Sequence, residues 1–458
     1  MHAFKRYLLR RHVYNRNLRP SRLIVTVFIG VILVGAILLS LPVASQDLHS
    51  VGILKALFTS TSATCTTGLT VVDTEQHWSF FGQAVILILC QIGGLGFMSV
   101  ISLFYFLLNK KIGLRERLMM MESMNLLEFE GVVRLMRHLL VGTLILELGG
   151  AVILSGCFIP DYGVADGIWR GIFMSVSAFC SAGFSNCYSD GLFSGGQSYH
   201  GNLLILITMG ILIIIGSLGF YVWEDILKRK RFRTLHLHSK LVLIVTASLI
   251  VAGTLIYLLL EGRNPTSLGE MSLPRKFVVS VFQAISDRTA GFDAAGHALL
   301  REDTKLLSML FMFIGGSSGS TAGGVKTVTV GILLLSAISV LRGRQELIIF
   351  HKKVPQTQVN QAATLVFVGI GVILTSGIII SILDEAGLFQ SLYAATSAYS
   401  TAGLSNGILS DANPFLLILT MFLMFFGKIG VLSISIAFLL RQHGKIKYTY
   451  PSEKVIIG

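Results

Sequence analysis

Four short segments of the chain share one pattern of residue types: a hydroxyl-bearing residue, a small residue, a glycine, and then Leu or Phe. These glycine segments, numbered 1 to 4, are Thr66-Thr67-Gly68-Leu69, Ser181-Ala182-Gly183-Phe184, Thr289-Ala290-Gly291-Phe292 and Thr401-Ala402-Gly403-Leu404. Their glycines are 115, 108 and 112 residues apart. A soluble core has no reason to repeat such glycines, because glycine buries no side chain. Backbone carbonyl oxygens of four segments around one axis can replace the water shell of a metal cation.

The elements around the glycine segments also recur four times. We expect a long apolar helix first, over residues 22–41, 134–158, 240–260 and 360–383. A shorter amphipathic helix should then lead into each segment, over residues 50–64, 166–180, 274–287 and 387–399. A second long helix should follow, over residues 80–108, 201–227, 304–342 and 413–441. The shorter helices cannot cross a bilayer, which makes them candidates for re-entrant helices.

Membrane physics dictates how these pieces must be arranged. Non-helical backbone at membrane depth must be covered by protein or line a water-filled cavity, so the glycine segments should face one another. The short helices would then aim their negative C-terminal ends at the common axis, which favours a cation. The residues therefore indicate a four-repeat cation pathway.

Composition supports a membrane protein. The chain has 458 residues, of which 53% are hydrophobic and only 13% charged, against about a quarter charged in soluble domains. We predict an all-α integral membrane protein with eight transmembrane helices and four re-entrant pore helices around one pseudo-fourfold pore. The predicted units are an N-terminal tail (1–21), repeat 1 (22–115), repeat 2 (130–235), repeat 3 (236–350) with an intramembrane loop (315–325), repeat 4 (355–445) and a C-terminal tail (446–458).

The net charge of +13 is explained by topology rather than by a nucleic-acid partner. Assigning the loops alternately to two sides puts 27 of the 37 Lys and Arg residues on one side. This asymmetry is the positive-inside signature, so both tails should be cytoplasmic. The opposite side carries 15 of the 24 acidic residues, which would attract cations to the outer mouth.

The second helix of the third repeat contains ten consecutive residues without a large side chain. This Gly-Ser loop is Gly315-Gly316-Ser317-Ser318-Gly319-Ser320-Thr321-Ala322-Gly323-Gly324. Each glycine costs a helix about 1 kcal/mol relative to alanine, so the run should break the helix inside the membrane and form a hydroxyl-rich loop beneath the glycine segments. Related motifs such as Gly93-Gly94-Leu95-Gly96 and Gly216-Ser217-Leu218-Gly219 are interpreted as close helix packing. The loop does not match a phosphate-binding loop, because Lys326 comes one residue late and no strand precedes the run.

Two cations stand out within the apolar stretches. Lys428 lies deep in the last apolar run, where charges are costly and usually functional. We expect it to project toward the cavity, hold the Gly-Ser loop and resist cation flow until a partner relaxes it. The loop would then act as a gate, in which Lys326 is also counted. Arg288 would repel a cation on the axis, so we expect it to turn away and pair, with Asp287 as the candidate.

The remaining candidates for chemistry are weak. Five cysteines without metal-ligand spacing, mostly in apolar segments, are interpreted as buried hydrophobes. An intramembrane enzyme would need a catalytic constellation, and no His-Glu-x-x-His motif, nucleophile elbow or pair of intramembrane aspartates is present in the sequence. Glu147, within an apolar helix, receives no functional assignment.

These residues resemble the Trk/Ktr/HKT superfamily of potassium transporters, closest to its bacterial KtrB-type membrane subunits. The marks are Arg288-Thr289-Ala290-Gly291-Phe292, the run Gly315–Thr327 and Phe426-Gly427-Lys428-Ile429-Gly430, in the right order over nearly the whole chain. The family commonly has arginine where this chain has Lys428, and lysine lacks the planar fork that holds several carbonyls at once.

The resemblance implies potassium uptake across the bacterial plasma membrane by the ion-conducting subunit of a KtrAB-like system. It implies four M1-P-M2 units around one pore, a homodimer of pores, and a cytosolic KtrA/TrkA-like ring that binds a regulatory nucleotide (ATP or ADP). The glycine segments would form a selectivity filter for K⁺, and Gly68 implies potassium, because a serine there accompanies sodium preference in the superfamily. A sodium-coupled potassium symporter and a TrkH-like subunit stay open, and with them a role for Na⁺.

Overall fold

The computed structural model describes residues 20–96, 132–187, 202–344, 346–384, 387–407 and 413–430, together with residues 99, 102, 105, 113 and 117. Most of both predicted tails and the predicted helical stretches after residues 96 and 430 lie outside these residues. The described elements are helices, apart from one two-stranded antiparallel hairpin of β1 (Ile348–Ile349) and β2 (Lys352–Lys353), in which Ile348 pairs with Lys353. The hairpin is a small departure from the all-α prediction.

The first two helices of each repeat lie close to where the sequence predicts them. The long first helices are α2 (Pro20–Ser40), α8 (Val132–Tyr162), α13 (Leu237–Leu260) and α17 (Gln356–Leu383). The shorter helices are α3 (Ile53–Thr64), α9 (Val164–Phe179), α14 (Leu273–Ser286) and α18 (Leu388–Ser400). Each long helix packs against the short helix that follows it in the chain.

The second helices end or are interrupted at glycines within the described residues. They are α5 (Phe80–Leu95), α11 (Leu203–Ser217) with α12 (Phe220–Arg229), α15 (Glu302–Phe313) with α16 (Thr327–Leu341), and α19 (Pro414–Ile429). The uninterrupted helix expected over 201–227 is wrong, because the chain bends by 93° between α11 and α12. Gly219 at this bend has a φ of 94°, which an α-helix cannot contain. Gly96 and Gly430 end α5 and α19 with the same left-handed geometry.

Short elements connect these helices. They are η1 (Pro42–Ala44), α4 (Thr74–His77), η2 (Phe232–Thr234) and η3 (His297–Leu299). The Gly-Ser loop separates α15 from α16, where its glycines predict a break.

Three helices of the described ranges are long and apolar enough to cross a membrane: α8, α13 and α17. The bent pair of α11 and α12 is a fourth candidate, and four shorter apolar helices lie at Ile24–Ser40, Phe80–Leu95, Thr327–Leu341 and Pro414–Ile429.

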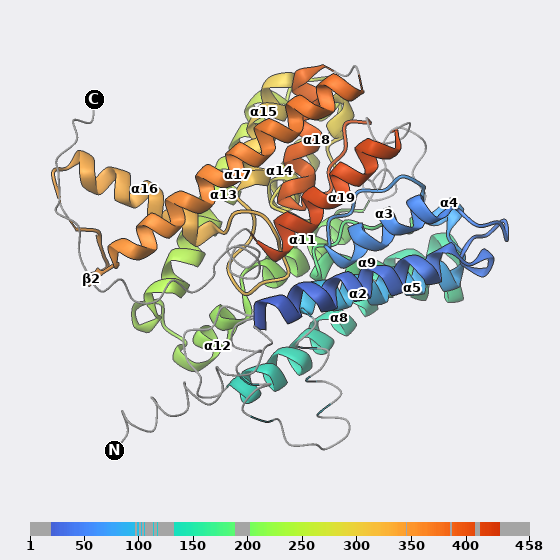
Figure 1. Cartoon of the computed structure of the whole chain (residues 1–458), viewed down its shortest axis with the longest axis horizontal. Coiled ribbons are helices and arrows are strands. Elements are labelled where there is room, and N and C mark those ends of the chain that lie inside the picture. Colours follow the sequence, from blue (N-terminus) through green and yellow to red (C-terminus); the bar gives the residue numbers. More distant parts are fainter. Residues whose placement is uncertain are drawn as a thin grey trace.

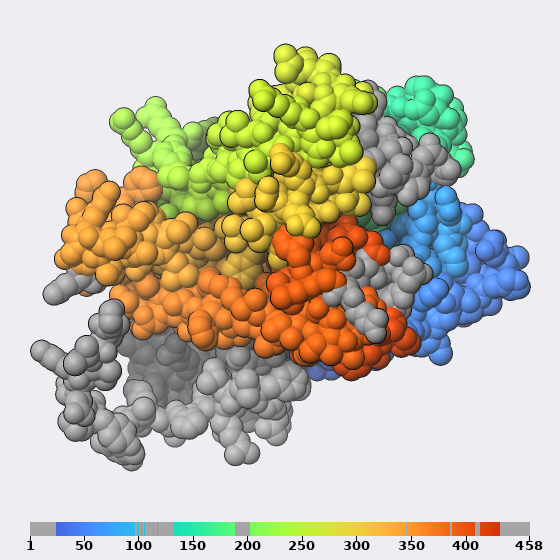
Figure 2. All heavy atoms as spheres, turned by 90° about the horizontal axis from the view of Figure 1, so that it is seen from above, coloured from blue at the N-terminus to red at the C-terminus, as the bar shows by residue number. Residues whose placement is uncertain are grey.

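The short helices occupy the centre of the molecule. In Figure 1, α2, α3, α5, α8 and α9 lie together on one side, while α13 to α18 form the other side. Figure 2, seen from above, shows the parts of the chain in colour order around the molecule, from blue through teal and yellow-green to orange. The most deeply buried side chains include one from each short helix: Phe58, Phe179, Phe282 and Tyr393 are at most 2% exposed.

Candidate ion-conduction site

The four glycine segments adopt the same unusual backbone. The first residue of each has a positive φ although it carries a side chain: Thr66 (50°), Ser181 (51°), Thr289 (89°) and Thr401 (53°). The glycine two residues later also has a positive φ: Gly68 (86°), Gly183 (71°), Gly291 (79°) and Gly403 (79°). A non-glycine residue in this region costs about 1–3 kcal/mol, so the surrounding structure must impose it four times.

The glycines meet in a closed ring. A methyl group added at Gly68 would lie 2.7 Å from the carbonyl oxygen of Ala182, which precedes the glycine of segment 2. The same relation joins segment 2 to segment 3 at 3.0 Å and segment 3 to segment 4 at 2.9 Å. A methyl group on Gly403 would overlap the carbonyl oxygen of Thr67, which returns the cycle to segment 1. Only glycine therefore fits at these positions, and each faces the backbone carbonyl of the next repeat.

The ring is enclosed by protein. Leu69, Phe184, Phe292 and Leu404, which follow the glycines, are at most 2% exposed and pack behind the segments. The hydroxyls of Ser177 and Ser286 on the short helices donate to the carbonyl oxygens of Phe184 (2.7 Å) and Phe292 (2.5 Å). These bonds anchor the far ends of segments 2 and 3 to their own helices.

Thr321 of the Gly-Ser loop lies against segments 1 and 2. The Thr66 hydroxyl donates to the Thr321 carbonyl oxygen at 3.4 Å. The hydroxyl oxygens of Ser181 and Thr321 lie 3.4 Å apart, and the Thr321 hydroxyl also donates to the carbonyl oxygen of Phe179 at 3.3 Å. The sequence analysis placed Thr321 in the Gly-Ser loop but did not predict these contacts, because Thr321 has no equivalent in the other repeats.

The loop also reaches segments 3 and 4. A methyl group added at Gly315 would lie 3.2 Å from the Thr289 side chain, and one added at Gly323 would overlap the Thr401 hydroxyl. The loop thus touches the first residue of all four segments. Its far side is tied to repeat 2, because the Phe220 N–H donates to the Gly319 carbonyl at 2.9 Å.

The two lysines converge on this loop. The Lys428 ammonium donates to the Thr66 hydroxyl and to the Thr321 carbonyl oxygen, both at 2.5 Å. The Lys326 ammonium donates to the carbonyl oxygens of Ala322 (2.6 Å) and Gly323 (3.4 Å). Lys428, from repeat 4, therefore links the loop of repeat 3 to the first segment.

Comparison with known proteins identifies the chain. Residues 1–447 match the family model described as "TrkH: Cation transport protein". The chain belongs to this family. The potassium/sodium uptake protein NtpJ of Enterococcus hirae is 36% identical over 97% of this chain and 98% of its own length. The Ktr system potassium uptake protein B of Bacillus subtilis is also 36% identical, over 96% of this chain and 97% of its own length.

A solved structure has the same fold. The crystal structure of the potassium transporter TrkH from Vibrio parahaemolyticus superposes with a TM-score of 0.70 and covers 93% of this chain and 86% of its own, at 17% identity. The family model and the two relatives confirm the resemblance drawn from the glycine segments and the Gly-Ser loop, and the solved structure shows the same fold. The chain is thus a multi-pass membrane protein of a cation transport family.

Arg288 of this TrkH-family protein is placed differently from the prediction. It is 3% exposed, and its guanidinium donates to the Gly315 carbonyl oxygen at 3.4 Å instead of pairing with Asp287. The predicted ion pair is wrong because Asp287 is already occupied by other partners. Arg288 adds a contact to the Gly-Ser loop.

The partners of Asp287 form a buried network behind segment 3. Its carboxylate accepts from the Tyr257 hydroxyl and from the Gln283 amide, both at 2.8 Å, and lies 3.2 Å from Nε2 of His297. Nδ1 of His297 lies 2.7 Å from the Tyr393 hydroxyl on the short helix of repeat 4. The network therefore joins repeats 3 and 4. The other repeats do not have these residue types at the equivalent positions, so no repeat pattern could reveal the network.

Carboxylates set the pKa of His297 in this network. Burial by itself lowers the pKa of the imidazole, but the negative charges of Asp293 and Asp287 outweigh it and shift the pKa upward. Asp293 also accepts the backbone N–H groups of Gly296 and His297 at 2.7 Å each. The stretch that follows segment 3 is thereby fixed on two sides.

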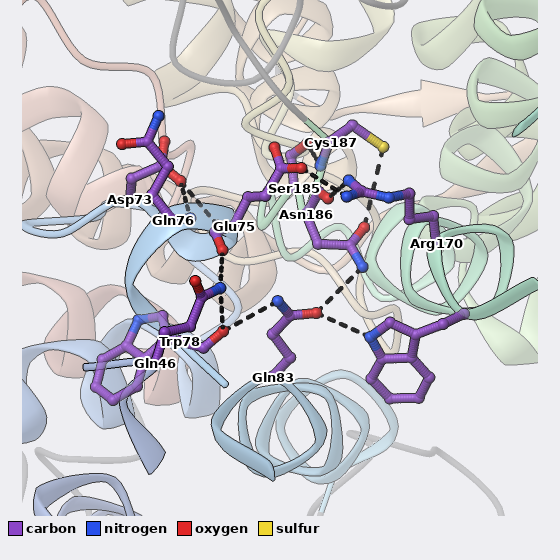
Figure 3. A network of polar contacts seen from close by, with 11 residues as sticks. Gln46, Asp73, Glu75, Gln76, Trp78, Gln83, Arg170, Ser185, Asn186 and Cys187 are labelled. Carbon is purple, nitrogen blue, oxygen red and sulfur yellow. Dashed lines mark hydrogen bonds and ion pairs between the residues drawn. The ribbon is translucent and has the colours of Figure 1, made fainter. Parts of the chain in front are cut away.

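A second network joins repeats 1 and 2 near the end of segment 2 (Figure 3). Arg170 of α9 forms an ion pair with Glu75 of α4 at 2.6 Å and also donates to the carbonyl oxygen of Asn186. Gln83 of α5 accepts from the Trp169 indole at 2.8 Å and from the Asn186 amide at 3.4 Å. Contacts from α9, α4 and α5 thus hold the residues that follow segment 2 in place.

The glycines of the second helices have the packing role that the sequence suggested. Methyl groups added at Gly93, Gly216 and Gly427 would overlap carbonyl oxygens in the last residues of the short helices, those of Thr64, Phe179 and Tyr399 respectively. Any side chain there would push the second helix away from the short helix that carries the glycine segment.

The described residues contain no group of three His, Cys, Asp or Glu side chains able to hold a metal ion. Glu147 is 6% exposed, and its carboxylate accepts from the Gln91 amide at 3.0 Å and from the Cys180 thiol at 3.9 Å.

Proposed function

We propose that this chain is the ion-conducting membrane subunit of a potassium uptake system. The observation that carries the proposal is the cycle in which each of four glycines faces the carbonyl of the next repeat. Such a ring of backbone oxygens can take the place of the water molecules that an alkali cation loses when it enters the ring. The printed functions of the relatives, which are potassium uptake and potassium/sodium uptake, agree with this chemistry.

In the proposed topology, four M1-P-M2 units make eight crossings around one pseudo-fourfold pore. Both termini then lie in the cytoplasm, where the positive-inside rule places the lysine- and arginine-rich side. K⁺ enters from the acidic outer side, sheds water at the filter formed by the glycine segments and moves inward. The membrane potential supplies about 2.3 kcal/mol per charge per 100 mV.

The Gly-Ser loop is the proposed gate. It lies against the first residue of every glycine segment, so an ion leaving the ring meets it directly. Lys428, Lys326 and Arg288 hold the loop carbonyls. A cytosolic ring that binds ATP or ADP would release these contacts. The ring would form a complex with a homodimer of pores, in keeping with the Ktr system in the name of the Bacillus subtilis relative.

The second candidate is sodium-coupled potassium symport. It is favoured by one observation, the printed name of the Enterococcus hirae relative, which includes sodium. The two candidates share the ring and differ in whether potassium movement requires sodium.

Rubidium uptake into proteoliposomes tests both candidates. The protein is reconstituted into vesicles with an inside-negative membrane potential. Uptake is measured with and without external sodium, and with and without the regulatory ring. Uptake that potassium competes for supports the proposal, and a strict sodium requirement selects symport. Absence of uptake under all conditions, together with failure to rescue a potassium-uptake-deficient strain when the regulatory subunit is co-expressed, refutes the transport function.

A further inference from the structure

The bend at Gly219 creates a groove that the ion pathway does not use. Because α12 leaves α11 at 93°, it does not continue along the axis of α11 and runs beside the N-terminal end of α8 (Figure 1). The groove between α8, the end of α11 and α12 has a volume of about 1100 Å³. Most of its wall is apolar and includes Ile145, Leu146, Ile215, Leu218 and Leu227.

One end of this groove is basic. Arg134, Arg137 and His138 line it from the first turns of α8, and Lys228 lines it from α12. All four are exposed, and neither arginine nor the histidine forms an ion pair or hydrogen bond with other described residues. Glu224 is the acidic residue of the lining, and its charge is neutralised by Lys228 at 2.5 Å. Among the described residues, no acidic side chain therefore pairs with either guanidinium group.

The depth of the basic end matches a lipid headgroup. This inference rests on the proposed topology, which puts the start of α8 at the cytoplasmic surface. Ile145 follows Arg137 by eight residues, so it lies about 12 Å deeper at 1.5 Å per residue. Trp223, whose indole donates to the Ile215 carbonyl at 2.9 Å, lies in the same wall, and tryptophan favours the membrane interface.

We propose that the groove binds an anionic phospholipid of the inner leaflet. Its phosphate lies between Arg134 and Arg137, and an acyl chain lies along Ile145 and Leu146. A basic pocket between helices on the cytoplasmic side is suited to such headgroups. A soluble anion would leave the apolar wall uncovered, and a cytosolic protein surface could not follow the wall into the hydrocarbon region. The 460 Å³ groove between α2 and α5, lined only by apolar residues and glycines, lacks the charge to select a headgroup.

The same site is connected to the proposed gate. Phe220 lines the groove, and its backbone N–H donates to the Gly319 carbonyl of the Gly-Ser loop at 2.9 Å. A second bond joins the Ser317 N–H to the Ser217 carbonyl at 2.9 Å. A lipid that holds α12 therefore acts on the element that carries one side of the loop, so transport should depend on anionic lipid.

Lipid binding to the full-length protein tests the inference. Native mass spectrometry compares phosphatidylglycerol with phosphatidylcholine of identical chains, for wild type and for the double variant Arg134→Gln/Arg137→Gln. The matched control is Arg342→Gln/Arg344→Gln, which removes the same charge from two exposed arginines outside the groove. We expect wild type and control to prefer phosphatidylglycerol, and the groove variant to bind it about 30-fold more weakly, since each basic residue near anionic lipid changes the affinity about fivefold.

Two further arms identify the occupant. Inorganic phosphate should not displace the lipid, whereas Ile145→Trp, which fills the apolar part and keeps both arginines, should weaken binding. Equal binding of the two lipids to wild type, an equal loss in the control, or full displacement by inorganic phosphate would each overturn the proposal.

Rubidium uptake separates this inference from the proposed function. Wild type should transport faster in vesicles containing phosphatidylglycerol than in pure phosphatidylcholine, and the groove variant should lose this difference. If wild-type uptake is the same in both kinds of vesicle and wild type does not bind phosphatidylglycerol preferentially, the lipid site is overturned and potassium transport stands. Lipid binding without any uptake refutes transport and leaves the lipid site standing.

Discussion

Replacing Lys428 with glutamine should raise ion flux through the transporter when no partner is present. Its ammonium joins the Thr66 hydroxyl to the Thr321 carbonyl oxygen, and both hydrogen bonds are 2.5 Å long. A hydrogen bond from a charged group contributes about 1.5–3 kcal/mol. A net loss of about 2 kcal/mol in the closed state changes the ratio of closed to open molecules about 30-fold, since about 1.4 kcal/mol corresponds to a factor of ten.

Rubidium uptake into proteoliposomes, without the regulatory ring, measures this effect. Lys428→Arg keeps the positive charge and the donors, so its flux should stay near that of wild type. Lys305→Gln serves as the charge control, because Lys305 donates to the Ala298 carbonyl in a connecting loop away from the gate. Wild-type flux and wild-type response to the partner in a folded Lys428→Gln protein would show that this lysine does not hold the gate closed.

Three other predictions concern the ring and its support. Gly403→Ala should abolish potassium-selective uptake, because the added methyl group would overlap the Thr67 carbonyl oxygen of segment 1, and such overpacking costs about 1–3 kcal/mol. The control is Gly371→Ala in α17, which should transport normally because the added methyl group meets no other atom. Tyr393→Phe should lower the thermal unfolding temperature in detergent, because it leaves a nitrogen of His297 without its 2.7 Å partner, at a cost of about 1–3 kcal/mol. Burial raises the pKa of Glu261, but hydrogen bonds from neighbouring hydroxyl, amide and backbone groups outweigh it and lower the pKa. The carboxylate thus stabilises the fold above its unfolded pKa, and this contribution is lost as pH falls through the lower folded pKa.

Each of these predictions has a result that contradicts it. Equal selective uptake by both alanine variants would mean that the ring tolerates a side chain. An unchanged unfolding temperature for Tyr393→Phe would show that the buried network contributes nothing to stability. Glu261→Gln should lose stability at neutral pH and should converge with wild type in acid, so a constant difference across the titration would exclude the carboxylate as its source.

The glycine segments show how far sequence reasoning reaches. Their recurrence predicted the four segments and the short helices before them, since each depends on local backbone preferences repeated four times. The break at the Gly-Ser loop followed from the glycine content of that one run. The asymmetry of lysine and arginine likewise follows from composition and order alone. The position of Lys428 within an apolar run predicted a functional role, because charged residues inside a membrane are costly and are usually functional.

What the sequence left undetermined involves residues that meet only in three dimensions. Arg288 lies next to Asp287 in the chain, yet it contacts Gly315, because Asp287 is held by Tyr257 and Gln283. The bend at Gly219 was interpreted as packing, since a glycine tolerates either role until its neighbours fix φ.

The sequence by itself determined the repeating units and the backbone that each unit needs, because helix length, glycine content and charge placement act locally. Only the tertiary structure decided which carbonyl faces which glycine, that Thr321 is the residue joining the loop to segments 1 and 2, and that α12 opens a groove beside α8. These arrangements depend on contacts between residues more than a hundred positions apart or on a single dihedral angle, and neither leaves a periodic signature in the chain.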